Sequence, residues 1–83
     1  MNCKYEVTVR AICPIHKVQD TYDVTVESPH EIIVESILEF VAALATVEET
    51  QENLTDTIAS KFPGTQITSV GYHSGVKTTV VAP

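Results

Sequence analysis

Cys13 and His16 are separated by two residues, and both carry side chains that bind zinc well. A catalytic zinc site needs about three protein ligands and an open position for water. Cys3 lies ten residues before Cys13, roughly 33 Å along an extended strand, so it could join only from another subunit. Within the chain, His30 and His73 are the other candidates. Two interpretations stay open: a zinc site that includes Cys13 and His16, or a buried cysteine beside an exposed loop histidine.

Cys13 is also a candidate nucleophile. A thiol attacks as the thiolate, so it needs a nearby base or positive charge. Asp20 follows seven residues later and could transfer protons if the intervening loop folds back. The alternative for Asp20 is a solvated loop aspartate. His73, in a predicted turn, is either a polar turn residue or an acid–base group that works near neutral pH.

Three glutamates, Glu48, Glu49 and Glu52, lie in the first turns of a predicted helix. The helix dipole explains Glu48 and Glu49 well, because negative charge is favourable near a helix N-terminus. Glu52 lies beside the apolar stripe of that helix, where a pocket or an interface could bury it. Its carboxylate could accept two hydrogen bonds from the N–H and amino group of a guanine-like ring.

Hydrophobic alternation places these residues on strands. Residues 4–13 and 21–27 alternate with a period of two, which predicts two half-buried strands joined by a loop at residues 15–20. Pro14 should end the pairing of the first strand. Residues 66–72 and 76–82 predict a second hairpin, with a turn at residues 73–75.

Two helices are predicted between the hairpins. Residues 28–31 and residues 46–49 both have the capping-box pattern that opens a helix. Pro63 and Gly64 should end the second helix, and almost no linker separates the two. The predicted apolar stripes are Ile33, Ile37, Phe40, Val41 and Leu44 on the first helix and Val47, Leu54, Ile58 and Phe62 on the second.

The fold class predicted from this order is α+β: a ββααββ unit with a four-stranded antiparallel sheet and two helices on one face. Residues 1–83 are too few for more than one domain, and so small a core is marginal by itself. Both outer strands of the sheet would lack partners, and copies that close into a barrel would satisfy them. We therefore expect a homo-oligomer, as a ring or as stacked rings.

The charge balance bears on the binding partners. Eleven acidic residues against five basic ones give a formal net charge of −6. Binding to a nucleic-acid backbone needs clustered Lys and Arg, so we expect no nucleic acid as a partner. The longest apolar-leaning stretch, residues 40–47, is too short to cross a bilayer, so we expect no membrane association. The N-terminus lacks the apolar core of a signal peptide, and we expect a cytoplasmic protein.

Over nearly its whole length, the chain resembles the tunnelling-fold (T-fold) superfamily, which includes GTP cyclohydrolase I and the nitrile reductase of queuosine biosynthesis. Residues 13–22 (Cys-Pro-Ile-His-Lys-Val-Gln-Asp-Thr-Tyr) are similar to a reductase segment with the same separation of cysteine and aspartate. The resemblance implies that Cys13 attacks the nitrile of a deazaguanine and that Asp20 transfers protons. It also implies active sites between subunits.

Two other segments resemble the cyclohydrolase. Residues 51–59 (Gln-Glu-Asn-Leu-Thr-Asp-Thr-Ile-Ala) match a segment whose glutamate anchors the purine or pterin ring, which implies that role for Glu52. A reductase-style alignment implies Glu48 instead. Cys13 and His16 match part of the zinc segment, and His73 matches a histidine in a third segment, where Gly75 replaces the last zinc ligand.

The differences from the two families limit which reactions the resemblance implies. GTP hydrolysis by the known zinc mechanism lacks ligands here, so zinc remains an open expectation. No lysine follows Glu35 and Ser36, where the reductase has its cofactor segment, so we do not expect NADPH. The favoured hypothesis is an enzyme acting on a purine-, pterin- or deazapurine-like heterocycle at a subunit interface. The alternatives are a non-catalytic T-fold oligomer that binds a heterocycle or a protein, and a purely structural module.

Overall fold

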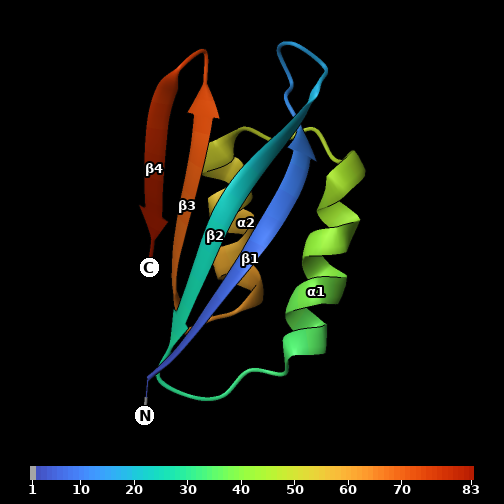
Figure 1. Ribbon diagram of the computed structural model, residues 1–83. Helices are drawn as coiled ribbons and strands as arrows, with labels where there is room; N and C mark the ends of the chain where they lie inside the picture. Colours follow the sequence, from blue (N-terminus) through green and yellow to red (C-terminus); the bar gives the residue numbers. More distant parts are fainter. Residues whose placement is uncertain (1) are drawn as a thin grey trace.

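Four antiparallel strands form one sheet in the order β1-β2-β3-β4 in the computed structural model, which describes residues 2–83. The strands are β1 (Cys3–Ile12), β2 (Gln19–Ser28), β3 (Gln66–His73) and β4 (Val76–Ala82). Both helices come between β2 and β3 in the chain (Figure 1). The predicted ββααββ order and antiparallel sheet are therefore confirmed.

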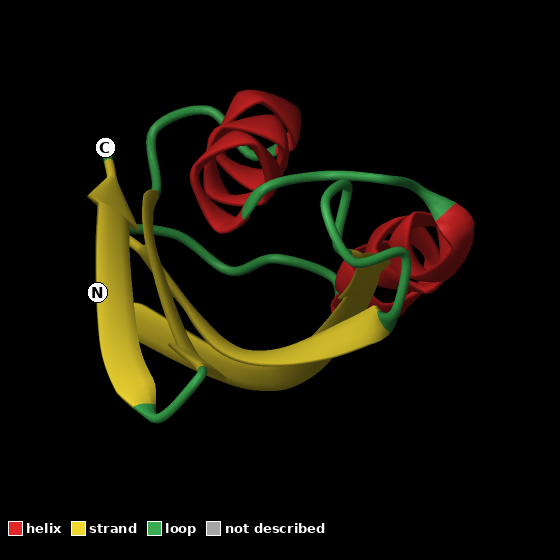
Figure 2. Cartoon of the chain, turned by 90° about the horizontal axis from the view of Figure 1, so that it is seen from above, coloured by secondary structure: helices red, strands yellow, loops and turns green. Residues whose placement is uncertain are grey.

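The two helices, α1 (Val34–Ala42) and α2 (Gln51–Lys61), lie on the same concave face of the curved sheet (Figure 2). A short 3₁₀ helix, η1 (Ala43–Thr46), continues α1. Helix α1 packs near β1, whereas α2 packs on β3 and β4. The aromatic rings of Phe40 and Phe62 meet edge to face, with their centroids 6.0 Å apart. No helix within residues 2–83 is long and apolar enough to span a membrane.

The predicted start of the first helix at residues 28–31 is wrong. Ser28 is the last residue of β2, where it pairs with Cys3, and its Oγ accepts a hydrogen bond from the His30 N–H (3.2 Å). The Ile32 N–H donates to the Tyr5 hydroxyl (2.9 Å), so the segment before α1 runs along the end of the sheet. Serine is favoured both in turns and as a helix cap, and here Ser28 is paired in the sheet instead of capping a helix.

The predicted capping box at residues 46–49 is also wrong. Thr46 ends η1, and the N-cap of α2 is Thr50, whose side chain accepts from the Asn53 N–H (3.2 Å). The residues between form a linker that pairs with the end of β1. The Ile12 N–H donates to the Val47 carbonyl (2.9 Å), and the Glu49 N–H donates to the Ile12 carbonyl (3.1 Å). An unpaired strand edge offers these groups, which explains why Val47 leaves the predicted helical stripe.

Both hairpin loops lie at the same end of the sheet (Figure 1). The β3–β4 turn is Ser74 and Gly75, with φ of 52° and 81°, as a tight hairpin with two left-handed residues requires. This confirms the predicted turn at Ser74 and Gly75, whereas His73, also predicted in the turn, is the last residue of β3. In the β1–β2 loop the Cys13 N–H donates to the Val18 carbonyl (2.8 Å), and the Lys17 N–H donates to the Cys13 carbonyl (2.9 Å). The loop thus folds back on itself beside Cys13.

Helix α2 is tied to the sheet by a buried polar network. The Gln51 Nε2 donates to the backbone carbonyls of Ser69 (3.2 Å) and Thr78 (2.9 Å). The Thr55 Oγ1 donates to the Gln51 carbonyl (2.7 Å), so the 2.6 Å contact between Thr55 and Ser69 has the Ser69 hydroxyl as its donor. Within residues 2–83, every buried side-chain nitrogen and oxygen has a hydrogen-bond partner. The first turn of α2 is therefore fixed on both β3 and β4.

Candidate functional site

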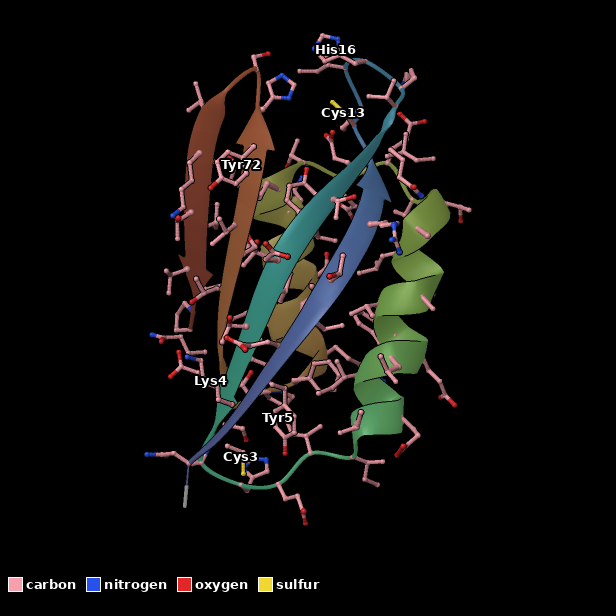
Figure 3. The ribbon with its side chains drawn as sticks, in the orientation of Figure 1. Cys3, Lys4, Tyr5, Cys13, His16 and Tyr72 are labelled. Atoms are coloured by element: carbon pink, nitrogen blue, oxygen red, sulfur yellow. The ribbon has the colours of Figure 1, made fainter. Side chains whose placement is uncertain are left out.

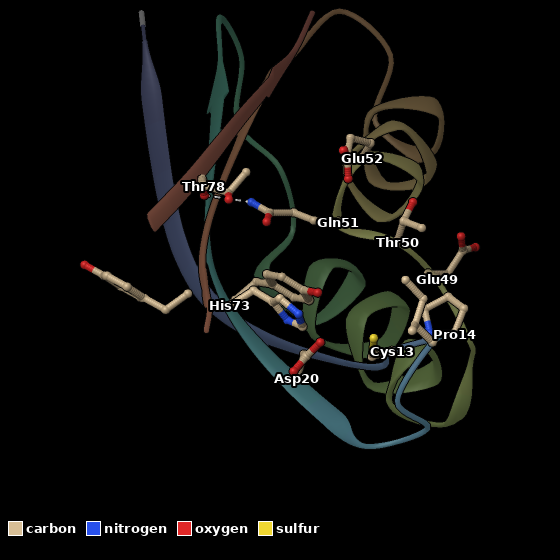
Figure 4. A pocket seen from close by; sticks show the side chains of 12 residues that line it. Cys13, Pro14, Asp20, Glu49, Thr50, Gln51, Glu52, His73 and Thr78 are labelled. Carbon is tan, nitrogen blue, oxygen red and sulfur yellow. Dashed lines mark hydrogen bonds between the residues drawn. The ribbon is translucent and has the colours of Figure 1, made fainter. Parts of the chain in front are cut away.

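A cavity of about 220 Å³ opens at the loop end of the sheet. Its walls come from three segments far apart in the chain: the β1–β2 loop with the start of β2, the linker and first turn of α2, and the β3–β4 hairpin (Figure 4). The side chains that bear on its chemistry are Cys13, Asp20, Tyr22, Glu49, Glu52 and His73.

Cys13 and Asp20 both line this cavity. Cys13 directly follows β1 and is buried, with 8% of its surface exposed. Asp20 is the second residue of β2, is half-buried and pairs with Ala11. The loop between them folds back as the sequence interpretation required. Both cysteines are free thiols, and Cys3 lies at the opposite end of the sheet from Cys13 (Figure 3).

The three glutamates that the sequence singled out have different surroundings. Glu52, in the first turn of α2, lines the cavity and is exposed in the single chain. Glu49 also lines it and is half-buried. Glu48 is not part of the lining, because its carboxylate pairs with the Lys17 ammonium and ties the β1–β2 loop to the linker.

His16, from the β1–β2 loop, and His73, the last residue of β3, meet at the rim. His73 lines the cavity, and its imidazole stacks on that of His16, with the ring centroids 5.4 Å apart and the planes 21° from parallel. His30 lies at the other end of the sheet, next to Ser28. Within the part of the chain that the structure describes, no three His, Cys, Asp or Glu side chains are grouped closely enough to hold a metal ion. The donors of one chain therefore do not fit zinc by themselves.

Tyr22 is a pocket residue that sequence reasoning missed as a functional candidate. Burial, the negative charges of Asp20 and Cys13, and hydrogen bonding to Asp20 raise the pKa of Tyr22 to about 12, with a further contribution from Glu52. The phenol therefore stays protonated at neutral pH, where it can donate a hydrogen bond. The period of two was the available signal, because it puts Tyr22 on the same face of the strand as Asp20.

The lining is acidic. Three carboxylates, from Asp20, Glu49 and Glu52, line the cavity, and no Lys or Arg does. A thiol beside a proton-accepting carboxylate can add to an electrophilic carbon. Carboxylates at the rim can accept hydrogen bonds from a flat ring that presents N–H groups. The arrangement suits covalent chemistry on a nitrogen heterocycle.

The raised pKa of Tyr22 predicts a loss of stability at alkaline pH. The unfolded chain ionises its tyrosines from about pH 10, whereas folded Tyr22 ionises near 12. Its contribution to the free energy of unfolding is therefore fully present below pH 10 and falls as the pH rises toward 12. Urea unfolding at about pH 9, 10 and 11 should show a steeper decline for the native chain than for Tyr22→Phe. Tyr72→Phe, at a ring that is 68% exposed, should keep the native decline. Equal slopes for the native chain and Tyr22→Phe would contradict this prediction.

A search of the solved structures finds the crystal structure of an archaeosine synthase QueF-Like in the apo form. It superposes with a TM-score of 0.91 at 23% sequence identity, over 98% of this chain and 90% of that chain. No protein-family model matches the sequence, and no curated protein matches it significantly. At this identity the similarity establishes a shared fold. Together with the strand order and the helices on one face, it shows that this chain is built as a T-fold unit.

Proposed function

We propose that this chain is a T-fold enzyme that acts on a deazapurine-type heterocycle bearing a nitrile. One observation carries the proposal: Cys13, Asp20 and Glu52, which come from separate segments, line one cavity. The archaeosine synthase with the same fold supports a deazapurine-type substrate. The family resemblance of residues 13–22 supports the nitrile as the reacting group.

The proposed reaction begins with addition of the Cys13 thiol to the nitrile carbon. A carbon–sulfur bond forms while one π bond of the nitrile breaks, and the nitrogen takes up a proton. Asp20 accepts the proton from Sγ and delivers it to that nitrogen, so no atom leaves and the product is a covalent thioimidate. His73 serves as a second proton carrier at the rim. No step uses a metal, which accords with the donor set of one chain.

Glu52 anchors the ring in this proposal. Its carboxylate accepts hydrogen bonds from a ring N–H and an exocyclic amino group, which orients the nitrile toward Cys13. Gln51, the neighbouring residue, is hydrogen-bonded to β3 and β4, so the backbone that carries Glu52 is held rigidly. Glu48 has a different task, because its pairing with Lys17 supports the rim from outside the cavity.

A second copy of the chain completes the site in our proposal. Within residues 2–83, β4 has a partner on only one side, and its residues Val76 and Val81 are 62% and 55% exposed. An outer strand with exposed apolar side chains is a template for pairing with another chain. Strand β4 also contributes Thr78 to the cavity wall, so a copy paired there would lie beside the site.

The covalent step predicts a mass change. After incubation with 7-cyano-7-deazaguanine, intact mass spectrometry should show an increase equal to the whole mass of the nitrile, because addition releases nothing. Cys13→Ala should show no increase. Cys3→Ala is the matched control, since Cys3 is a free thiol at the other end of the sheet, and it should react like the native chain. Absence of an adduct on the native chain, or its persistence in Cys13→Ala, would refute the reaction and favour a chain that only binds heterocycles.

The anchoring role predicts a loss of affinity. Glu52→Gln should weaken binding of the nitrile to the Cys13→Ala chain by about 1.5 kcal/mol, the lower end for charged hydrogen bonds, because Glu52 is exposed in the single chain. That energy is roughly tenfold in the dissociation constant, measurable by calorimetry. Asp56→Asn, one helical turn farther along α2 and outside the cavity lining, should bind like the parent chain. Equal affinities for the Glu52 and Asp56 variants would remove the anchor role.

The proposed assembly predicts a defined oligomer. Native mass spectrometry of the purified chain should report a single multimer. Val81→Lys, which places a charge on the exposed side of β4, should shift it toward monomers, because charged residues block edge pairing. Asp56→Lys changes an exposed helix position and should leave the multimer intact. A native chain that is monomeric at micromolar concentration would show that the site belongs to one copy alone.

A further inference from the structure

Gly71 lies inside β3, two residues before its end, and is buried. A Cβ atom at this position would lie 2.5 Å from Cδ1 and 2.7 Å from Cε1 of Tyr22, and 3.3 Å from Oε1 of Gln51. The Tyr22 ring therefore occupies the space that any other side chain at residue 71 would fill. Glycine weakens a strand interior, so a buried glycine there marks a place where another group must approach closely.

The space that Gly71 leaves for the Tyr22 ring, called the notch below, fixes where the Tyr22 hydroxyl points. Tyr22 lies on β2 next to the Asp23–Val70 pair of the β2–β3 ladder, so its ring crosses directly onto Gly71. It shares a strand face with Asp20, two residues earlier, and both line the cavity with Cys13. Farther along the same face, Val24 and Val26 are buried and purely apolar. The phenol is thus the point at which this apolar face becomes polar.

We propose that Tyr22 is a positioning residue, whose hydroxyl, placed by the notch at Gly71, holds the Asp20 carboxylate in the orientation that exchanges a proton with Cys13. The inference deepens the proposed function and rests on it for the identity of the substrate. The proton moves between Sγ and the Asp20 carboxylate, and Tyr22 keeps its own proton throughout.

The groups that face the phenol fit this role. Asp20, Cys13 and Glu52 all oppose its ionisation, so the phenol keeps its proton at neutral pH. A phenol donor placed next to a half-buried carboxylate can occupy one of its oxygens and leave the other for the thiol.

The test is a double-mutant cycle read out on the thiol, without the nitrile. In a Cys3→Ala background, the rate of Cys13 alkylation by iodoacetamide is measured for the parent, Tyr22→Phe, Asp20→Asn and the double variant. If Tyr22 acts through Asp20, Tyr22→Phe changes the rate by roughly threefold or more in the parent and by less than about 1.5-fold in the Asp20→Asn background. The same ratio in both backgrounds, or no change in the parent, overturns the proposal.

Tyr5→Phe is the matched control. Its hydroxyl is also hydrogen-bonded, to the Ile32 N–H (2.9 Å), but Tyr5 lies at the opposite end of the sheet (Figure 3). Its loss should leave the alkylation rate unchanged. Phenylalanine keeps the ring in the notch, and circular dichroism verifies that the Tyr22 variant is folded. Should it not be, Gly71→Ala, which displaces the ring and keeps the hydroxyl, takes its place in the same cycle.

With the nitrile present, Tyr22→Phe should slow adduct formation by roughly tenfold or more and leave the dissociation constant of the nitrile unchanged. A chain that forms no adduct in any variant would refute the proposed function, whereas the alkylation cycle would still decide the role of Tyr22. A change in affinity without a change in rate would make Tyr22 a binding residue and overturn the positioning role.

Discussion

The partly buried hydrogen bonds of Gln51 are the contact on which the site depends. Its amide reaches the Ser69 and Thr78 carbonyls on two different strands, while Thr55 and Ser69 close the network from the next turn of α2. Polar groups buried at this contact, such as Thr55 and Ser69, would cost about 1 to 3 kcal/mol each if left unpaired, which opposes sliding of the helix. An apolar contact would let the helix slide along the sheet, whereas these hydrogen bonds fix the position of α2 on β3 and β4. These hydrogen bonds therefore fix the helical turn that carries Glu52.

The other two walls are held by different means. The β1–β2 loop is closed by backbone bonds around Cys13 and is tied to the linker through Lys17 and Glu48. The β3–β4 hairpin is set by its two left-handed turn residues, and its His73 meets His16 from the first loop. Cys13 and Asp20 thus lie between one rigid wall, the first turn of α2, and two rims, the β1–β2 loop and the β3–β4 hairpin. The rims are held by more exposed contacts than the wall. Exposed ion pairs contribute little stability, so the rims are the parts that can yield to a ligand.

The sequence predicted the elements well where one local pattern was decisive. Alternation located β1 and β2, a high content of Thr, Val and Ile located β3 and β4, and the predicted turn at residues 73–75 contains the observed turn residues Ser74 and Gly75. Helix starts failed because two capping boxes met competing sheet edges: Ser28 pairs with Cys3, and the residues from Val47 to Glu49 pair with Ile12. Local sequence does not encode which strand edge is free.

Spacing and resemblance indicated Cys13, Asp20, Glu52 and His73, and the structure places all four around one cavity. Tyr22 and Gln51 escaped notice because their roles depend on cross-strand neighbours, Gly71 and Ser69, whose register no single segment reveals.

The Thr78 carbonyl that receives Gln51 belongs to the last strand, and this has a consequence for biogenesis. Translation proceeds at roughly 5 to 20 residues per second, so the ribosome adds Thr78 several seconds after Cys13. Until Thr78 has been made and β4 has paired with β3, Gln51 lacks one of its acceptor strands, so α2 is not yet fixed beside Cys13. The cavity around the thiol is therefore completed late in synthesis.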